Sequence, residues 1–144
     1  MNKFIYFFST AIFLSLTIIS CGKNDPDSPN GGWYLISENN EIIGDMIFSK
    51  NDVEEIWVDS SLIDGRNIHK VTGGFTPNAT ARLAVFTEQN IGKRFGFALD
   101  REVITSDIIS QKDDEGRFSI LFNKKSKAQR AYESLLIDVL NTKQ

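Results

Sequence analysis

Cysteine and histidine are almost absent from this chain, whose 144 residues include one of each, Cys21 and His69. Structural zinc sites combine several cysteines and histidines, and a catalytic triad needs a nucleophile and a carboxylate placed around its histidine. His69 lies in a predicted strand, with no second histidine or further cysteine to join it. The sequence therefore predicts no metal site, no cofactor and no histidine-based catalytic centre.

A single cysteine cannot form an internal disulfide, so the folded part must be stable through its hydrophobic core. The charge balance excludes another class of protein. Lysine and arginine number 16 against 19 acidic residues, a formal net charge of −3, and no basic stripe with interleaved aromatics is present. Domains that bind phosphate backbones usually show such a stripe, so we expect no nucleic-acid partner.

The acidic residues single out no site either. Asp113, Asp114 and Glu115 are adjacent, whereas calcium needs six to eight oxygens from spaced ligands, which favours a solvated turn over a cation site. Carboxylate pairs can meet in a folded chain, but with 19 acids no spacing distinguishes one pair. We therefore expect the chain not to be an enzyme.

No apolar run reaches the roughly 20 residues that span a bilayer as a helix. The longest, residues 4–19, follows one charge, Lys3, and ends at Ser20 and Cys21. A positive start, an apolar stretch and a small residue at the cut are typical of an export signal. Residues 18–21, Ile-Ile-Ser-Cys, resemble the bacterial lipoprotein signal. The alternative is an uncleaved helix.

The lipoprotein resemblance implies that residues 1–20 are a signal peptide and that Cys21 becomes a diacylated N-terminus anchored in a membrane. Loss of Lys3 leaves a formal charge of about −4. Residues 21–32 lack large apolar side chains and predict a flexible tether, with the folded domain at residues 33–144. We expect a place in the cell envelope, at the outer membrane rather than the inner. Acidic residues just after Cys21 also resemble a surface-export signal of Bacteroidota lipoproteins.

Alternating and turn-forming residues predict the first half of the domain. Residues 33–36 and 41–48 are expected to form a hairpin, and Ser49 with Asp52 resembles a capping box for a short helical turn. Residues 56–61 and 66–75 flank a strong Asp-Gly turn signal and predict a second hairpin. Trp57 lies between two apolar residues, which favours a half-buried core position over a binding aromatic.

The second half contains both principal helices. Thr76 and Pro77 are a strong helix start, and the helix is expected over residues 77–89, ended by Asn90 and Gly92. Residues 90–109 predict two strands around a turn at residues 100–102. Residues 117–122 predict the last strand. The final helix is expected from Lys124, with one apolar face made of Ala128, Ala131, Tyr132, Leu135, Leu136, Val139 and Leu140. The fold class is α+β, two helices packed on a mainly antiparallel sheet.

Residues 76–100 carry a resemblance to a known family. An alanine- and arginine-containing helix is followed by Asn-Ile-Gly-Lys and by a hydrophobic strand ending in Leu-Asp, as in the head subdomain of the first periplasmic domain of SecD. The matching residues are Asn90, Ile91, Gly92, Lys93, Leu99, Asp100 and Val103. The resemblance covers roughly residues 66–140. It implies an α+β head domain, here in a stand-alone bacterial lipoprotein, with Asn90, Gly92 and Asp100 as the motif's turn positions.

The sequence departs from the family pattern in two places. Arg101 stands where family members usually have glycine, and Thr-Ser-Asp at residues 105–107 replaces the usual Ser-Ala-Pro. Arginine adopts a positive φ less cheaply than glycine, so a different turn type or local strain is expected at Arg101. The multi-span membrane part of SecD is also missing, so the resemblance does not extend to a complete translocation motor.

Three lysines stand at the start of the final helix, where the helix dipole disfavours cations. Lys124, Lys125 and Lys127, together with Arg130, predict either a basic patch for an anionic partner or exposed, solvated charges. Arg101, Lys124, Lys125 and Lys127 are therefore the candidate partner contacts.

The function expected from these observations is a membrane-tethered, non-catalytic binding module of the cell envelope. The SecD resemblance implies recognition of a polypeptide, either an exported chain or an envelope protein, at a sheet edge or at the cleft beside Asp100. The alternative from another class is a small-ligand carrier or small enzyme with a carboxylate-lined pocket. A third reading is an immunity-like or structural lipoprotein with one dedicated partner.

Overall fold

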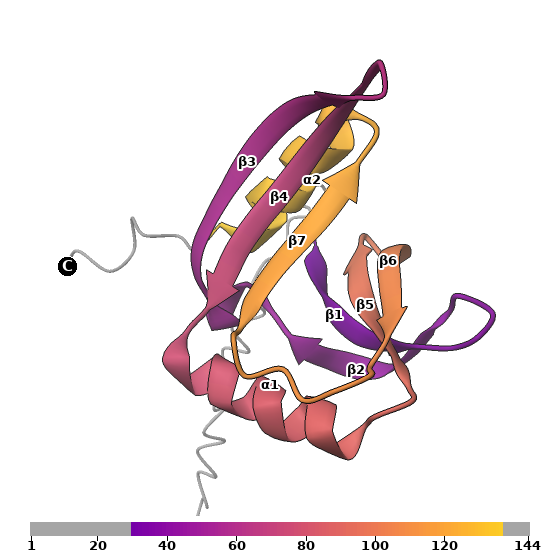
Figure 1. The fold of residues 1–144 in the computed structure, drawn as a ribbon, viewed down its shortest axis with the longest axis vertical. Helices are drawn as coiled ribbons and strands as arrows, with labels where there is room; N and C mark the ends of the chain where they lie inside the picture. The colour runs from indigo at the N-terminus through magenta and orange to yellow at the C-terminus, as the bar shows by residue number, and fades with distance from the viewer. Residues whose placement is uncertain (1–29, 137–144) are drawn as a thin grey trace, which may run out of the picture.

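Two antiparallel sheets and two principal helices make up the domain, in a computed structural model that describes residues 30–136 (Figure 1). The predicted signal at residues 1–20, Cys21 and most of the predicted tether lie outside the described residues. In chain order the elements are β1 (Gly31–Ile36), β2 (Ile42–Phe48), the short 3-10 helix η1 (Lys50–Asp52), β3 (Val53–Ile63), β4 (Arg66–Phe75), α1 (Pro77–Gln89), β5 (Arg94–Leu99), β6 (Glu102–Ile108), β7 (Arg117–Phe122) and α2 (Lys125–Leu135). The α+β class is confirmed.

The strands divide into a four-stranded sheet in the order β2-β1-β5-β6 and a three-stranded sheet in the order β3-β4-β7. The strands are antiparallel as expected, but they form two sheets rather than one. Two long-range pairings produce this division: β5 pairs with β1, and β7 pairs with β4. The chain therefore passes from the first sheet to the second, back to the first and again to the second. Figure 1 shows α2 along one face of the three-stranded sheet and α1 across the end of the molecule opposite the β3–β4 turn.

Trp33 joins the two sheets in the core. Its ring packs edge-on against Phe97 of its own sheet, at 5.1 Å between centroids, and against Phe75 and Phe118 of the other sheet, at 4.9 and 4.8 Å. Edge-to-face pairs at these separations are favoured by the charge distribution of the aromatic rings. The side chain is almost fully buried, so Trp33 fixes how the two sheets meet.

Local sequence signals place several elements where they were expected. The Thr76 hydroxyl accepts a hydrogen bond from the Ala79 amide at 3.2 Å, and α1 spans the predicted residues 77–89. The capping box of Ser49 and Asp52 is confirmed. The Asp52 carboxylate also forms an ion pair with Arg82 of α1. The residue that caps η1 therefore also connects η1 to α1.

The start of the folded domain and the position of Trp57 differ from the predictions. The strand β1 begins at Gly31, so the folded domain begins before the predicted boundary at residue 33, and Gly31 and Gly32 are buried. A side chain at Gly31 would lie 2.2 Å from the Ser134 hydroxyl, because α2 packs directly on this strand. Trp57 is 38% exposed and lies outside the core cluster, since its position on β3 points away from the side on which Ile56 meets the core.

The helix α2 ends at Leu135, and Leu136 is extended and exposed. Val139 and Leu140, assigned to the same helix by the sequence analysis, lie outside the described residues. Ala128, Ala131 and Leu135 are buried as the apolar spacing predicted. Over residues 30–136 we find no helix whose length and apolar character would let it cross a bilayer.

Candidate binding groove

The strands β6 and β7 are outer strands of different sheets, and each leaves one edge unpaired. A hollow lies between these two edges. Near the end of β6 and the start of β7 its volume is about 460 Å³, and a smaller hollow of about 210 Å³ continues at the start of β6 and the end of β7. We refer to the two hollows together as the β6–β7 groove.

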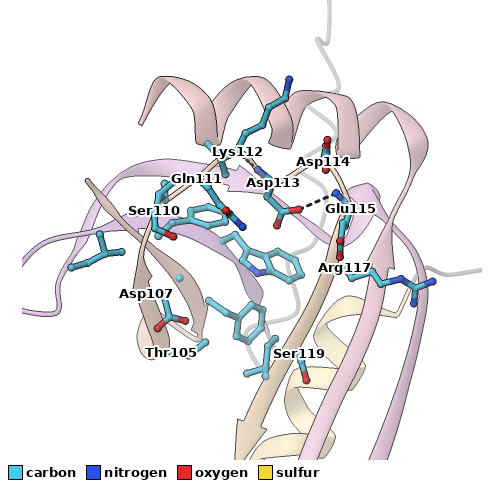
Figure 2. A pocket seen from close by; sticks show the side chains of 18 residues that line it. Thr105, Asp107, Ser110, Gln111, Lys112, Asp113, Asp114, Glu115, Arg117 and Ser119 are labelled. Carbon is cyan, nitrogen blue, oxygen red and sulfur yellow. Dashed lines mark hydrogen bonds between the residues drawn. The ribbon is translucent and has the colours of Figure 1, made fainter. Parts of the chain in front are cut away.

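Figure 2 shows how the larger hollow is built. Thr105 and Asp107 of β6 form one wall, and Arg117 and Ser119 of β7 form the opposite wall. The loop from Ser110 to Glu115 closes the end near α1. Buried aromatic side chains, Trp33 and Phe97 among them, lie beneath. The groove therefore has apolar side chains at its base and unpaired main-chain hydrogen-bonding groups along both walls.

The loop at the end of the groove is held in place at several points. The Asp113 amide donates to the buried Thr87 hydroxyl of α1 at 2.8 Å, and the Asp113 carboxylate accepts from the Glu115 and Gly116 amides at 3.1 and 3.3 Å. The Ile109 amide donates to the Lys93 carbonyl at 2.8 Å. These bonds fix the groove without a ligand, which reduces the ordering entropy that binding must overcome.

The larger hollow has more acidic than basic side chains in its lining: Asp107, Asp113, Asp114 and Glu115 against Lys112 and Arg117. Within residues 30–136, no three acidic, histidine or cysteine side chains come close enough to hold a metal ion. Asp113 uses one oxygen to hold its own turn.

Asp100 organises the turn between β5 and β6. Its amide donates to the Asn30 carbonyl at 2.7 Å, and its Oδ1 accepts from the Asn30 amide at 2.9 Å. Its Oδ2 accepts from Arg130 of α2, at 3.2 Å from Nε and 2.8 Å from Nη2. The Asn30 amide first and Arg130 second hold the pKa of Asp100 below its ordinary value. The motif aspartate therefore joins the entry strand, the β5–β6 turn and α2.

Asn90 and Gly92 build the connection between α1 and β5. The Asn90 side chain donates to the Phe86 carbonyl at 2.8 Å and accepts from Lys93 Nζ at 2.9 Å. Gly92 has a φ of 89°, and its amide donates to the Ile109 carbonyl at 2.8 Å. Both motif positions serve the fold, and Gly92 also positions the chain that leads into the groove loop.

The candidate partner contacts are separated by the fold. Lys127 Nζ lies 2.8 Å from the Glu102 carboxylate, so the β5–β6 turn already pairs with this lysine. Arg101 is exposed on the same turn, and its charge opposes the rise in the pKa of Tyr34 that burial causes. Lys124 and Lys125 are exposed at the start of α2. The predicted basic patch is therefore reduced to Lys124 and Lys125 on this helix.

The structure adds one contact that the sequence analysis missed. Ser60 Oγ lies 2.8 Å from His69 Nδ1, across the β3–β4 pairing. A serine beside a histidine is the first half of a nucleophile–base pair. Both residues lie on an exposed strand surface and line neither hollow of the groove.

The groove could not be located from sequence because its walls come from strands that never pair. One signal was available. The polar run Thr105, Ser106 and Asp107 interrupts an apolar strand, which is typical of an edge strand beside solvent. No comparable signal marks the exposed edge of β7.

Neither a known sequence family nor a curated protein sequence matches this chain. Among solved structures, it is similar to SecDF, a membrane component that enhances protein export, with a TM-score of 0.53 and 26% identity over 70% of this chain and 44% of that chain. SecDF in a super-membrane-facing form matches with a TM-score of 0.52 and 26% identity over 70% of this chain and 13% of that chain. The present chain thus spans less than half of either SecDF chain. The resemblance to SecD is confirmed, and the folded part is a domain like the head of the first periplasmic domain of SecD.

Proposed function

We propose that this protein is a non-catalytic, membrane-associated module of the cell envelope that acts in protein export by holding extended segments of polypeptide. The observation that carries the proposal is the pair of unpaired strand edges, β6 and β7, on either side of one groove. The similarity to SecDF, a component that enhances protein export, supports the cellular role.

The groove suits an extended chain because strand edges recognise main chain. An added strand gains hydrogen bonds from the edge whatever its sequence, while neighbouring hollows accept alternate side chains. The buried aromatic base favours apolar side chains, and the acidic loop side favours basic ones. A module of this kind would bind many exported chains weakly rather than one partner tightly.

Membrane attachment is part of the same proposal. We expect diacylated Cys21 to hold the domain at the envelope membrane, in the outer membrane rather than the inner, with surface exposure as a further possibility from the acidic residues after the cysteine. Metabolic labelling with a fatty acid tests this step directly. The wild-type chain should incorporate the label, and Cys21→Ser should not.

A small-ligand carrier is the competing function. A third hollow of about 560 Å³, beside the β1–β2 turn, is lined by Leu35, Ile43 and Ile108 among others, and it would admit a small apolar molecule. It is open, and Ile108 lines both this hollow and the larger hollow of the β6–β7 groove, so the two adjoin at the end of β6. The carboxylate-lined pocket expected from sequence as the alternative corresponds to the larger hollow of the groove, whereas the hollow beside the β1–β2 turn has one carboxylate, Glu38, in its lining.

Crosslinking tests the polypeptide-binding proposal. All clustered core residues lie between Trp33 and Leu135, so the fragment of residues 22–144 keeps the complete core. A photoreactive amino acid replaces Ser119 on the wall of the groove, and in a matched control it replaces Val85, an exposed position on α1. The probe is a reduced, alkylated secreted protein that cannot fold, compared with its native form.

The proposal predicts crosslinks to the unfolded probe from position 119, few to the native probe, and few from position 85. Equal crosslinking from both positions would mean nonspecific contact. No crosslink from position 119 would remove the groove from the proposal and direct attention to the hollow beside the β1–β2 turn.

A further inference from the structure

The end of the β3–β4 hairpin projects beyond the rest of the molecule, opposite α1 (Figure 1). We call residues 61–68 the hairpin tip. Its Leu62 is 70% exposed, more than any other large apolar side chain in the described part of the chain, and Ile63 is 52% exposed. Two neighbouring aliphatic side chains at the end of a projecting ribbon lose the stabilisation that burial would give them.

The tip is a rigid hairpin. Strand pairing continues to the last possible pair, Ile63 with Arg66, and only Asp64 and Gly65 form the turn. Their φ angles of 50° and 74° are those of a type I′ turn, whose twist matches that of paired strands. The apolar side chains are thus held outward by regular backbone pairing.

Leu62 and Ile63 lie on opposite faces of the ribbon, because successive side chains on a strand alternate. A protein partner with a flat or grooved surface would cover one of these faces and leave the other in water. A lipid interface surrounds a narrow ribbon and accepts both side chains at once. The geometry of the tip therefore favours a membrane as its occupant.

Basic residues surround the base of the tip. The strand β7 ends at Phe122, opposite His69, and Lys124 and Lys125 follow beside the ribbon. Arg66 lies in the tip itself. Within residues 30–136, no carboxylate lies within salt-bridge distance of Lys124, Lys125 or Arg66. These three cations are therefore available to anionic lipid headgroups.

The acidic residues near the tip are fewer. Asp64 lies in the turn, and Asp59 accepts a hydrogen bond from the Trp57 ring nitrogen at 3.2 Å, further down β3. The acidic groove loop lies at the other end of the molecule, beside α1 (Figure 1). Because charges are screened over about 8 Å at physiological salt, the local positive charge of the tip outweighs the chain's net charge of −3 at a membrane surface.

We infer that the hairpin tip docks on an anionic lipid bilayer, with Leu62 and Ile63 in the interfacial layer and Lys124 and Lys125 at the lipid phosphates. This contact is independent of lipid attachment at Cys21. It would add a second point of membrane contact and hold the domain in one orientation.

An environment-sensitive dye on the tip of the full chain tests the inference. Cys21→Ser removes the native thiol, and Ser61→Cys accepts the dye while leaving Leu62 and Ile63 in place. The protein is reconstituted into vesicles of phosphatidylcholine alone or with about a third phosphatidylglycerol, to supply an anionic surface. The matched control places the dye at Glu88→Cys, an exposed position on α1 at the opposite end of the molecule.

We expect blue-shifted emission from position 61 in the anionic vesicles, little shift in phosphatidylcholine, and none from position 88 in either. Replacing Lys124 and Lys125 by glutamine should lower the docked-to-undocked ratio about fivefold for each lysine. Leu62→Ser with Ile63→Ser should lower it by about tenfold or more. All four side chains are exposed, so both variants should keep the wild-type unfolding temperature.

Three results would overturn the inference. Equal emission from position 61 in both kinds of vesicle would show no preference for anionic lipid. An anionic shift that both double variants retain would show that these side chains do not make the contact. A shift that requires added envelope proteins would assign the tip to a protein partner.

Discussion

Asp100 and Arg130 join two elements that are distant in sequence, with Arg130 Nη2 of α2 lying 2.8 Å from Asp100 Oδ2 in the β5–β6 turn. The other carboxylate oxygen accepts from the Asn30 amide, where the described chain enters β1. The aspartate of the family motif is therefore a structural tie, and its effect is measurable as stability.

Asp100→Asn should lower the free energy of unfolding by about 1 kcal/mol at neutral pH, because a partly exposed charged hydrogen bond is lost. The pKa of Asp100 in the folded state lies below its ordinary value of 3.8. A carboxylate whose pKa is lowered by folding stabilises the fold at any pH above its pKa in the unfolded state. This stabilisation is lost as the pH falls through its pKa in the folded state.

Denaturant titrations of both proteins over a pH series check this prediction. The difference between wild type and Asp100→Asn should be constant at neutral pH and shrink below about pH 4. Glu102→Gln is the control, because it loses an ion pair to Lys127 in which both side chains are largely solvated. A difference that persists unchanged into acid would show that the charge of Asp100 is not responsible.

Arg101 carries the strain expected from its place in the family pattern. Its φ is 67°, next to 51° at Asp100, so both turn residues adopt the left-handed conformation. Arg101→Gly should raise the free energy of unfolding by about 0.5 to 1 kcal/mol, because glycine adopts this conformation without a clash. Thermal unfolding measures the change, and no gain or a loss would mean that the arginine side chain compensates for the strain.

Gly96 is required by close strand packing rather than by backbone conformation. A Cβ at Gly96 would lie 2.0 Å from the Thr105 carbonyl oxygen in the paired strand β6. Gly96→Ala should therefore cost about 2 kcal/mol or more and disturb one wall of the groove. Gly92→Ala is the matched control, because its φ is 89° but nothing lies within 4 Å, so it should cost only about 1 kcal/mol. Equal costs would contradict the steric account.

Thr87 connects α1 to the groove loop, accepting from the Asp113 amide while its hydroxyl donates to the Leu83 carbonyl at 2.8 Å. Thr87→Val keeps the shape of the side chain but removes both bonds, at a cost of about 1 to 2 kcal/mol. Hydrogen exchange at the Asp113 amide should become faster, while exchange in β4 should change only with global stability. Unchanged exchange at Asp113 would show that the loop is held by its other contacts.

The local parts of this fold were predictable because their causes are local. Thr76 and Pro77 set the start of α1, and Ser49 with Asp52 set the cap of η1, through side chains within a few residues of the backbone groups they bind. The bounds of β7 followed from a short apolar run between turn residues. The strain at Arg101 could also be predicted, because a tight hairpin turn requires particular φ angles at its central residues.

The arrangement of the strands could not be obtained in this way. The pairing of Trp33 with Phe97 and that of Val71 with Ile120 join segments separated by dozens of residues, and no local pattern specifies either. The groove depends on these pairings, because they decide that β6 and β7 are outer strands. The position of Trp57 was predicted wrongly because its neighbours on both sides are apolar. The alternation of apolar and polar residues that would show which face of β3 is buried is therefore absent there.

The central claim is that an unfolded polypeptide adds to the facing edges of β6 and β7. Backbone amide hydrogen exchange, measured with and without a reduced and alkylated secreted protein, tests it most directly. The account predicts slower exchange for amides in β6 or β7, with no change in the outer strands β2 and β3. Unchanged exchange in β6 and β7, or protection confined to β2 or β3, would contradict it.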